Sequence, residues 1–264
     1  MTILDEIFAN KRIEVEMRKH KFPLPGLRSA AEEAPASPGF IQAIRSAQNS
    51  PALITEVKFA SPSKGTLVEN PAPVVLARTY TSNGADAISV LTDEKYFHGH
   101  LDHLQRIHAA LPHMPLLRKD FIYDPYQVYE ARVAGASAVL LIAAQLDSPQ
   151  LADLHALVLS LGIAALVEVR DRVELEAALQ MEGLDLLGVN NRDLRTFQVD
   201  LQTCLDLRPL VPTEICFVAE SGIHTVQDVH RLRAAGVDAM LIGEALVTAP
   251  DIAEQIRAFK ILEL

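Results

Sequence analysis

The chain has 264 residues, of which 49% are hydrophobic and 22% are charged, and this composition is typical of a folded globular protein. The formal net charge of −10 disfavours a basic face, so we expect no nucleic-acid partner and no anionic membrane surface as a partner. The sequence lacks an apolar run of about 18 residues and a basic, apolar leader, so the expected location is the cytoplasm.

The first 50 residues differ from the rest of the chain. Residues 3–21 have the pattern of a charged amphipathic helix, and residues 22–38 are rich in proline and are predicted to be irregular. We interpret residues 1–50 as a helical extension that packs on the main fold, not as a second domain.

From residue 52 onward, short aliphatic runs alternate with amphipathic segments of helical period, which is the pattern of repeated βα units. Helices are predicted at 125–134, 172–182 and 226–235, among other segments. The predicted strands are residues 53–59, 87–92, 116–121, 138–143, 164–169, 186–190, 216–220 and 239–243.

Helix boundaries are also legible in the sequence. Pro125 and Pro149 follow Asp124 and Ser148, which we expect to be N-caps. Glycines that follow apolar helical stripes are expected to adopt left-handed conformations at helix ends, and these are Gly84, Gly135, Gly162 and Gly236.

Eight βα units in about 250 residues fit a closed (β/α)8 barrel better than a doubly wound sheet. Neither a GxGxxG nor a GxxxxGK[ST] sequence is present, so a dinucleotide or P-loop site has no support. The sequence therefore predicts an α/β protein in which residues 1–264 form a single (β/α)8-barrel domain with an N-terminal helical extension.

Ionisable side chains gather where the predicted strands end, which is the face on which barrel enzymes build their active sites. The alternation Glu56-Val57-Lys58 directs Glu56 and Lys58 to the same side of the first strand. Other strands end in Arg118-Lys119-Asp120, in Glu168, in Asn190-Asn191-Arg192 and in Glu220-Ser221-Gly222. Lysines and carboxylates that converge on one mouth shift each other's pKa values, so we predict an acid–base site.

Two glycine-containing turns follow the last two strands, at Ser221-Gly222 and Gly243-Glu244. In barrels this position commonly binds phosphate through backbone N–H groups, so a phosphorylated, anionic small molecule is the expected substrate. The segment 61–65 after the first strand has the composition of a mobile loop that closes over such a ligand.

Metal and redox chemistry have little support in the sequence. The histidines have no HExxH arrangement, and we expect the four that lie closest together, His98, His100, His103 and His108, to be solvated surface residues. Cys204 and Cys216 are too few and too isolated for a disulfide scaffold, so reduced structural cysteines are expected.

Several long segments together resemble the indole-3-glycerol phosphate synthase family. They are residues 56–65, 89–97, 117–121, 124–127, 166–169, 188–192 and 220–223, and they occur in the order and spacing of that family. The resemblance implies conversion of 1-(2-carboxyphenylamino)-1-deoxyribulose 5-phosphate to indole-3-glycerol phosphate, carbon dioxide and water, without metal or cofactor. It also implies a place in tryptophan biosynthesis.

The resemblance assigns roles to residues of this chain. Lys119 matches the general acid of ring closure, and its pKa is expected to be tuned by Arg118 and Lys58 so that it gives up its proton readily at neutral pH. Glu168 matches the base of the second step, with Lys58 or Lys119 as its acid. Glu56 and Glu220 match residues that orient the lysines and the substrate. Asn190, Arg192 and Ser221 match residues that contact the substrate.

Further matches concern the two ends of the substrate. The phosphate site matches Ser61, Gly222 and Gly243, but the turn Gly243-Glu244-Ala245 lacks the hydroxyl that many members carry there. Binding of the phosphate at Glu244 must then use its backbone N–H, with the carboxylate pointing away. The aromatic ring is expected to lie between Phe97, Phe121 and Leu194.

Other readings of the same residues stay open. A sister phosphate-binding barrel would be a phosphoribosylanthranilate isomerase, or an aldolase that uses Lys119 as a Schiff-base nucleophile. A non-catalytic metabolite-binding barrel is a third possibility. We expect a monomer that associates at most weakly with other tryptophan-pathway enzymes.

Overall fold

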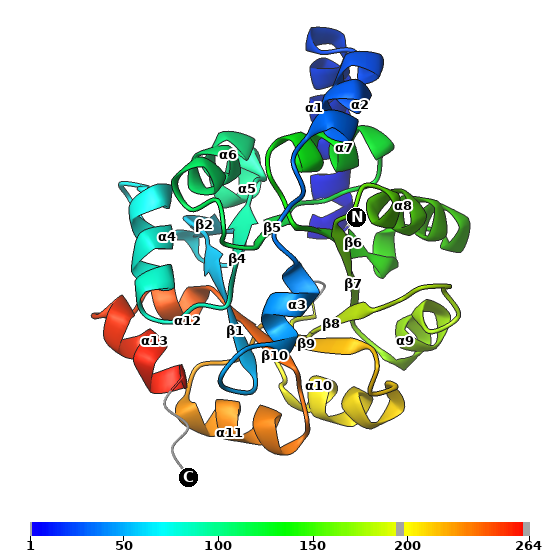
Figure 1. The fold of residues 1–264 in the computed structure, drawn as a ribbon. Helices are drawn as coiled ribbons and strands as arrows, with labels where there is room; N and C mark the ends of the chain where they lie inside the picture. The colour runs from blue at the N-terminus through cyan, green and yellow to red at the C-terminus, as the bar shows by residue number, and fades with distance from the viewer. Residues whose placement is uncertain (1, 194–197, 261–264) are drawn as a thin grey trace.

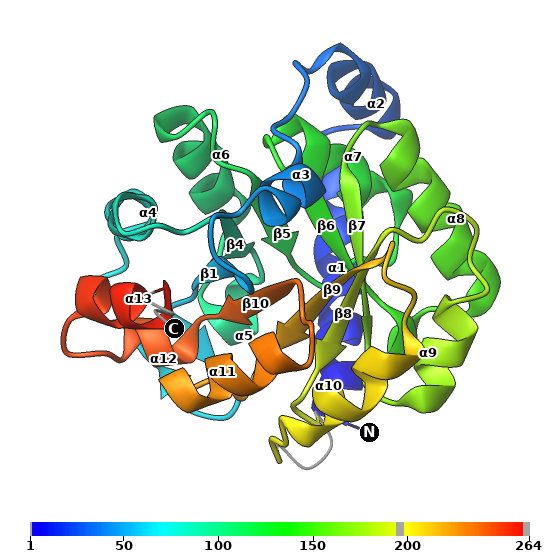
Figure 2. The same cartoon turned by 60° about the horizontal axis from the view of Figure 1, so that its bottom comes forward.

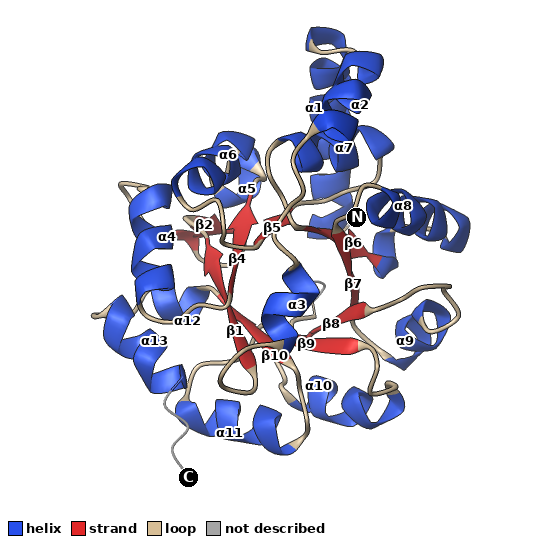
Figure 3. Cartoon of the chain, in the orientation of Figure 1, coloured by secondary structure: helices blue, strands red, loops and turns tan. Residues whose placement is uncertain are grey.

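The centre of the computed structural model, which describes residues 2–193 and 198–260, is a closed parallel barrel with the strand order β1-β10-β9-β8-β7-β6-β5-β4. Figure 3 shows this ring of strands surrounded by helices. The predicted (β/α)8 barrel is therefore confirmed. Its strands are β1 (Ala52–Val57), β4 (Ala87–Leu91), β5 (Leu116–Lys119), β6 (Ala138–Ile142), β7 (Ala164–Val169), β8 (Leu186–Asn190), β9 (Cys216–Glu220) and β10 (Ala239–Ile242).

The outer layer consists of helices that follow the strands along the chain (Figure 1). A small antiparallel hairpin, β2 (Ala60–Ser61) and β3 (Gly65–Thr66), lies after β1. Short 3-10 turns, η1 (Ala143–Gln145) and η2 (Arg208–Leu210), interrupt two connections. The helices are α4 (Pro73–Ser82), α5 (Glu94–Phe97), α6 (Leu101–Ala110), α7 (Pro125–Val133), α8 (Ser148–Ser160), α9 (Arg172–Ala178), α10 (Gln202–Leu207), α11 (Val226–Ala234), α12 (Glu244–Val247) and α13 (Ile252–Lys260).

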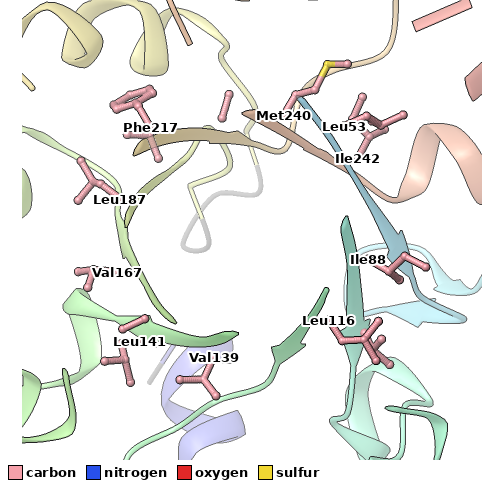
Figure 4. Close-up of a cluster of buried hydrophobic side chains, with 14 of the residues drawn as sticks. Leu53, Ile88, Leu116, Val139, Leu141, Val167, Leu187, Phe217, Met240 and Ile242 are labelled. Carbon is pink, nitrogen blue, oxygen red and sulfur yellow. The ribbon is translucent and has the colours of Figure 1, made fainter. Parts of the chain in front are cut away.

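Alternation along each strand divides the apolar side chains into two layers, because successive side chains of a strand point to opposite faces. One set points outward from the ring toward the helices, as the labelled side chains of Figure 4 show. The other set fills the inside of the barrel and includes Ile54, Leu117, Leu166 and Val218. The inside is thus a packed core, and only its end at the carboxyl termini of the strands is available for chemistry.

The N-terminal extension packs against both ends of this inner core. It forms α1 (Ile3–Lys21), α2 (Leu24–Glu33) and α3 (Phe40–Arg45). Phe40 of α3 and Leu4 and Phe8 of α1 belong to the same buried cluster as the inward-facing strand residues. Helix α3 lies over one opening of the ring in Figure 1, and the first turns of α1 lie at the opposite end in Figure 2.

The prediction that residues 22–38 are irregular is wrong, because α2 occupies most of that segment. Pro23 is the N-cap of α2 and Pro25 lies in its first turn, where a missing N–H costs no helical hydrogen bond. Leu27 and Ala31 then pack with Tyr126 and Tyr129 of α7. This tertiary contact, which no local pattern reveals, stabilises the helix.

Most predicted boundaries agree with the structure to within a few residues. The four helix-ending glycines all have positive φ, at 102° for Gly84, 90° for Gly135, 70° for Gly162 and 73° for Gly236. Asp124 caps α7 as expected, but α8 is capped by Asp147 and not by Ser148. Helix α9 also ends at Ala178, earlier than predicted.

The histidine prediction is only half right. His98 and His100 are exposed, whereas His103 and His108 are half-buried. The amphipathic helix α6 turns both toward the barrel layer, where His103 meets the Phe59 ring edge-on and His108 lies against Gly135. In the described part of the chain no three His, Cys, Asp or Glu side chains are grouped to hold a metal ion.

Both cysteines are free and buried, as the composition predicted. Among residues 2–193 and 198–260, no helix has the length and apolar character that crossing a membrane requires.

Candidate functional site

A cavity of about 150 Å³ opens at the carboxyl ends of the barrel strands. It is closed at the bottom by inward-facing Leu140, Leu241 and their neighbours, and its polar wall comes from several different strands. Every predicted site residue in the described part of the chain lines it: Glu56, Lys58, Ser61, Phe97, Lys119, Phe121, Glu168, Asn190, Arg192, Glu220, Ser221, Gly222, Gly243 and Glu244. Leu194 lies outside the described residues.

Lys119 occupies the centre of the polar wall, at the end of β5. Its Nζ lies 3.1 Å from Glu168 Oε2 and 2.5 Å from Glu220 Oε2, both of which are almost fully buried. Asn190 Nδ2 donates to the other oxygen of Glu168 at 3.3 Å. The parallel register places Asn190 beside Glu220 and Glu168 beside Gly188, so three neighbouring strands, β7, β8 and β9, hold the partners of the β5 lysine.

The carboxylates raise the pKa of Lys119 above its ordinary value. Burial alone lowers the pKa of this amine, but the charges of Glu220, Glu168 and Glu56 outweigh that effect. Conversely, burial raises the pKa of Glu220 to about 7, against the opposing charge of Lys119. The expectation that neighbours ease proton loss from Lys119 is therefore wrong for the protein without substrate, in which the amine is held fully protonated.

Arg118 does not belong to this site. Alternation along β5 turns it outward, where it is completely buried and bonds to Thr92, Asp120, Glu130 and the carbonyl of Gln127. The expectation that Arg118 tunes Lys119 is wrong, because adjacent residues of a strand face opposite sides. Its role is to join β5 to the first turn of α7.

A second lysine, Lys58, lines the same cavity. Lys58 Nζ is 2.8 Å from Glu56 Oε1, and both side chains face the lumen, as the alternation in the sequence predicted. The backbone of Gly243 runs behind Glu56, where an added Cβ would lie 2.4 Å from the same Oε1. The absence of a side chain at 243 thus leaves room for the carboxylate that holds Lys58.

The turns after β9 and β10 expose backbone to the cavity. Ser221 and Gly222 follow one another with φ of 65° and 77°, and the positive φ of a serine marks a conformation that the surrounding structure enforces. Asn191 fixes this turn from below, because its Nδ2 donates to the carbonyls of Glu220 and Ser221. Successive backbone N–H groups in such a turn can face an anion.

The hairpin of β2 and β3 reaches across to the turn after β10. Lys64 Nζ lies 2.6 Å from Glu244 Oε1, and Arg192 Nη2 lies 3.7 Å from Glu244 Oε2. Glu244 lines the cavity, and the cations of Lys64, Lys58 and Arg192 lower its pKa against the effect of burial. Whether its carboxylate turns away from a bound phosphate stays a prediction. In the structure, the Glu244 carboxylate pairs with the cations of Lys64 and Arg192 in the cavity that Gly222 and Gly243 also line.

An apolar wall faces the charged one. The ring of Phe121 lies 5.9 Å from that of Phe97 and meets Phe8 of α1 edge-on at 5.6 Å. Helix α1 also contributes lining residues that the sequence analysis did not identify: Ile3, Leu4 and Ile7. The spacing of Leu4, Phe8, Lys11 and Val15 on one buried face was the available signal, but it could not show what that face covers.

Comparison with known proteins gives a consistent answer. A sequence model of the family described as "Indole-3-glycerol phosphate synthase" matches residues 4–259. The chain is 54% identical over 263 residues to the indole-3-glycerol phosphate synthase of Roseiflexus castenholzii, covering 97% of each chain. It is 47% identical to that of Dehalococcoides mccartyi, over 97% of this chain and 98% of the relative. Among solved structures, 3-hexulose-6-phosphate synthase from Salmonella typhimurium is similar in fold, with a TM-score of 0.65, 17% identity and coverage of 79% of this chain and 96% of its own.

Proposed function

Because the chain belongs to the indole-3-glycerol phosphate synthase family, we propose that its cavity performs the reaction of that family. The anilino-deoxyribulose phosphate closes a ring between its carboxylate-bearing aryl carbon and the C2 carbonyl, and then loses carbon dioxide and water. The observation that carries the proposal is a protonated Lys119 held between Glu168 and Glu220 at the cavity wall, with a second lysine, Lys58, lining the same cavity.

In ring closure, Lys119 acts on the C2 carbonyl oxygen. That oxygen gains negative charge as the carbon–carbon bond forms, and a fixed ammonium in a site with little water stabilises this charge strongly. The developing alkoxide is far more basic than the two carboxylates, so it can take the proton that they cannot. The raised pKa of Lys119 thus keeps the acid loaded until substrate arrives.

After carbon dioxide leaves, the second step removes a ring proton and expels the C2 oxygen as water. Glu168 is the proposed base, and Lys58 or Lys119 protonates the departing oxygen. Asn190 orients the Glu168 carboxylate through its 3.3 Å hydrogen bond. Glu56 and Glu220 are assigned the positioning of the lysines, one for each.

The two ends of the cavity suit the two ends of the substrate. Backbone N–H groups of Gly222, Gly243 and Glu244, with Ser61 opposite, face the phosphate, and Arg192 and Ser221 contact the substrate between the two ends. Phe97 and Phe121 line the other end, where they are proposed to hold the aromatic ring. Leu194 remains a proposed part of that wall.

Different lysines are expected to serve different steps. In Lys119→Met, ring closure stops and the starting compound accumulates, whereas in Lys58→Met the intermediate formed after decarboxylation accumulates if Lys58 expels the C2 oxygen. Methionine keeps the length of the side chain and removes its charge. Quenched single-turnover reactions analysed by mass spectrometry measure both species. The same accumulating species in both variants would contradict the division of labour.

The pH dependence of kcat/KM should report the ionisation of the Glu220 carboxylate. With a pKa of about 7, its carboxylate is ionised above that pH and protonated below it, and protonation removes a charge that holds Lys119. We therefore expect kcat/KM to fall by about tenfold per pH unit below neutrality. Substrate phosphate also titrates in this region, so Glu220→Gln is the control. The part of the acid limb due to Glu220 should vanish in that variant, and an unchanged profile would refute the assignment.

The rival reactions fit the site less well. A Schiff-base aldolase needs a neutral lysine as nucleophile, but Lys119 has two carboxylates within 3.1 Å and a raised pKa. An isomerase of the sister type needs a cysteine at the barrel mouth. Cys216 begins β9 at the opposite end of the barrel and Cys204 lies in α10. Borohydride trapping with substrate tests the first rival directly, since a covalent adduct on Lys119 would overturn the acid–base role.

The test of the proposed function is the appearance of indole fluorescence when the purified protein meets the anilino-deoxyribulose phosphate. The chain contains no tryptophan, so its own indole background is absent. Wild-type protein is expected to give a rising signal under multiple turnover. Folded protein that gives no signal would instead support a sister barrel or a binding role.

We also propose that residues 1–264 work as one domain, as a monomer in the cytoplasm, with at most weak association with other enzymes of the pathway. Support comes from the shared core of α1, α3 and the barrel interior. The cavity also contains the side chains to which the proposal assigns the acid, the base, and the phosphate and ring contacts.

A further inference from the structure

Gly188 stands at an unusual place for a glycine. It is an inward-facing residue in the middle of β8, between Leu186 and Asn190, and a glycine there weakens a strand because it has no side chain to pack. Its backbone does not require glycine either, since Gly188 is absent from the glycines of positive φ. The reason for a glycine must therefore lie in the space beside it.

That space is occupied by the carboxylate of Glu220. A Cβ added at position 188 would lie 2.3 Å from Glu220 Oε1 and 3.4 Å from its Cδ, with Leu166 Cδ1 next at 3.2 Å. The other oxygen, Oε2, is the one that contacts Lys119 Nζ at 2.5 Å. The side chain of Glu220 thus reaches Lys119 by folding over the bare backbone of Gly188.

The Glu220 oxygen that lies next to Gly188 is Oε1, and no hydrogen bond from the described residues holds it in place. In the part of the chain that the structure describes, Glu220 Oε1 is buried without a hydrogen-bond partner. A carboxylate held by one contact on one oxygen keeps its orientation only if the surrounding surface confines the other oxygen. Gly243 provides an analogous surface behind Glu56, so two of the lysine-holding carboxylates of the cavity, those of Glu220 and Glu56, rest against a glycine.

We propose that Gly188 is a positioning residue for the reaction: its missing side chain creates the recess that seats the Glu220 carboxylate and thereby sets the place of Lys119. The proposal rests on the proposed function, because it is the Lys119 acid that benefits. A side chain at 188 would meet the movable end of Glu220, so we expect the barrel to fold and the carboxylate to move.

The first measurement is the steady-state kinetics of Gly188→Ala in the fluorescence assay, with thermal unfolding as a check of the fold. A displacement of about 1 Å at a reacting group can reduce a rate by about 100-fold. We expect kcat to fall by roughly 10- to 100-fold while KM changes little, because the phosphate and ring contacts are untouched. Gly26→Ala is the control, since its added Cβ would lie 3.6 Å from the nearest atom, and it should match wild type.

A double-mutant cycle with Glu220→Ala separates positioning from a general packing defect. If Gly188 acts through the Glu220 carboxylate, Gly188→Ala costs nothing further once that carboxylate is removed. An equal loss in both backgrounds would mean that the added methyl acts through Leu166 and would overturn the proposal. Wild-type kcat in Gly188→Ala would overturn it as well.

If Gly188→Ala fails to fold, the double variant should fold, because its colliding carboxylate is gone; failure of both overturns the proposal. An inactive wild-type protein would refute the proposed function, and in that case the position of the carboxylate is judged from crystal structures. If the Glu220 side chain keeps its position in the crystal structure of Gly188→Ala, the proposal that Gly188 seats this carboxylate is refuted.

Discussion

Lys119→Met is expected to lower kcat by about 100- to 10,000-fold, the range over which general acids contribute. The ammonium lies in the cavity between Glu168 and Glu220, and the neighbouring amide of Asn190, which bonds to Glu168, carries no charge that could replace it. Methionine also leaves the Glu220 carboxylate buried beside Glu168 without its cation, which raises the pKa of Glu220 further. The measurement is initial rate by indole fluorescence at saturating substrate, with quantified folded protein.

The matched control is Lys260→Met. Lys260 is also a partly buried, ion-paired lysine, with Nζ 2.7 Å from Asp86, but it lies in α13 outside the cavity lining. Its loss is expected to leave kcat within about twofold of wild type, since it has no contact with the reacting groups. Comparable activity in Lys119→Met and wild type would refute the role of Lys119 as the acid.

Lys11→Met is expected to destabilise the protein by about 3–5 kcal/mol, the cost of removing one partner from a buried ion pair. Lys11 is 1% exposed in α1 and reaches into the barrel, where its Nζ lies 2.8 Å from Asp93 and 3.0 Å from Asp120. Burial lowers the pKa of this amine, but the two aspartates outweigh it and hold the pKa above its usual range. Without Lys11, the buried Asp93 carboxylate keeps its Tyr96 N–H contact and loses the ammonium that lies 2.8 Å from it.

Chemical denaturation measures this effect as a lower midpoint at unchanged slope. Lys19→Met is the control from the same helix. Its ammonium also meets two carboxylates, of Glu16 and Asp124, but it is 29% exposed, so the expected cost is below about 1 kcal/mol. Equal midpoints for the two variants would show that the buried network does not anchor α1 to the barrel.

The loss of Lys11 also concerns the site. Asp120 directly follows Lys119 and accepts from Arg118 and Thr92, while its other oxygen accepts from the Phe121 N–H. Helix α1 is therefore tied by charge to the segment that carries both the proposed acid and a wall of the aromatic pocket. The extension that the sequence separates from the barrel is joined to its chemistry in three dimensions.

Two kinds of local information were sufficient to predict much of this protein. Repeated short aliphatic runs and helical periods gave the eight βα units, because strand and helix bury apolar side chains with different spacings. Strand-end residues such as Glu56, Lys58 and Glu168 were recognisable as a site, because the carboxyl ends of barrel strands meet at one mouth whatever the details of the loops. Family resemblance then named the reaction.

Other features depended on contacts between segments that lie far apart in the sequence. Helix α2 was missed because its stability comes from Tyr126 and Tyr129 of α7. Lys119 was expected to lose its proton easily, but Glu220, distant along the chain, contacts it and raises its pKa. Gly188 carried no local signal at all, since its meaning is the position of a carboxylate on the next strand. Periodicity determines which face a residue occupies, whereas the strength of its interactions depends on distances that are set only when the barrel closes.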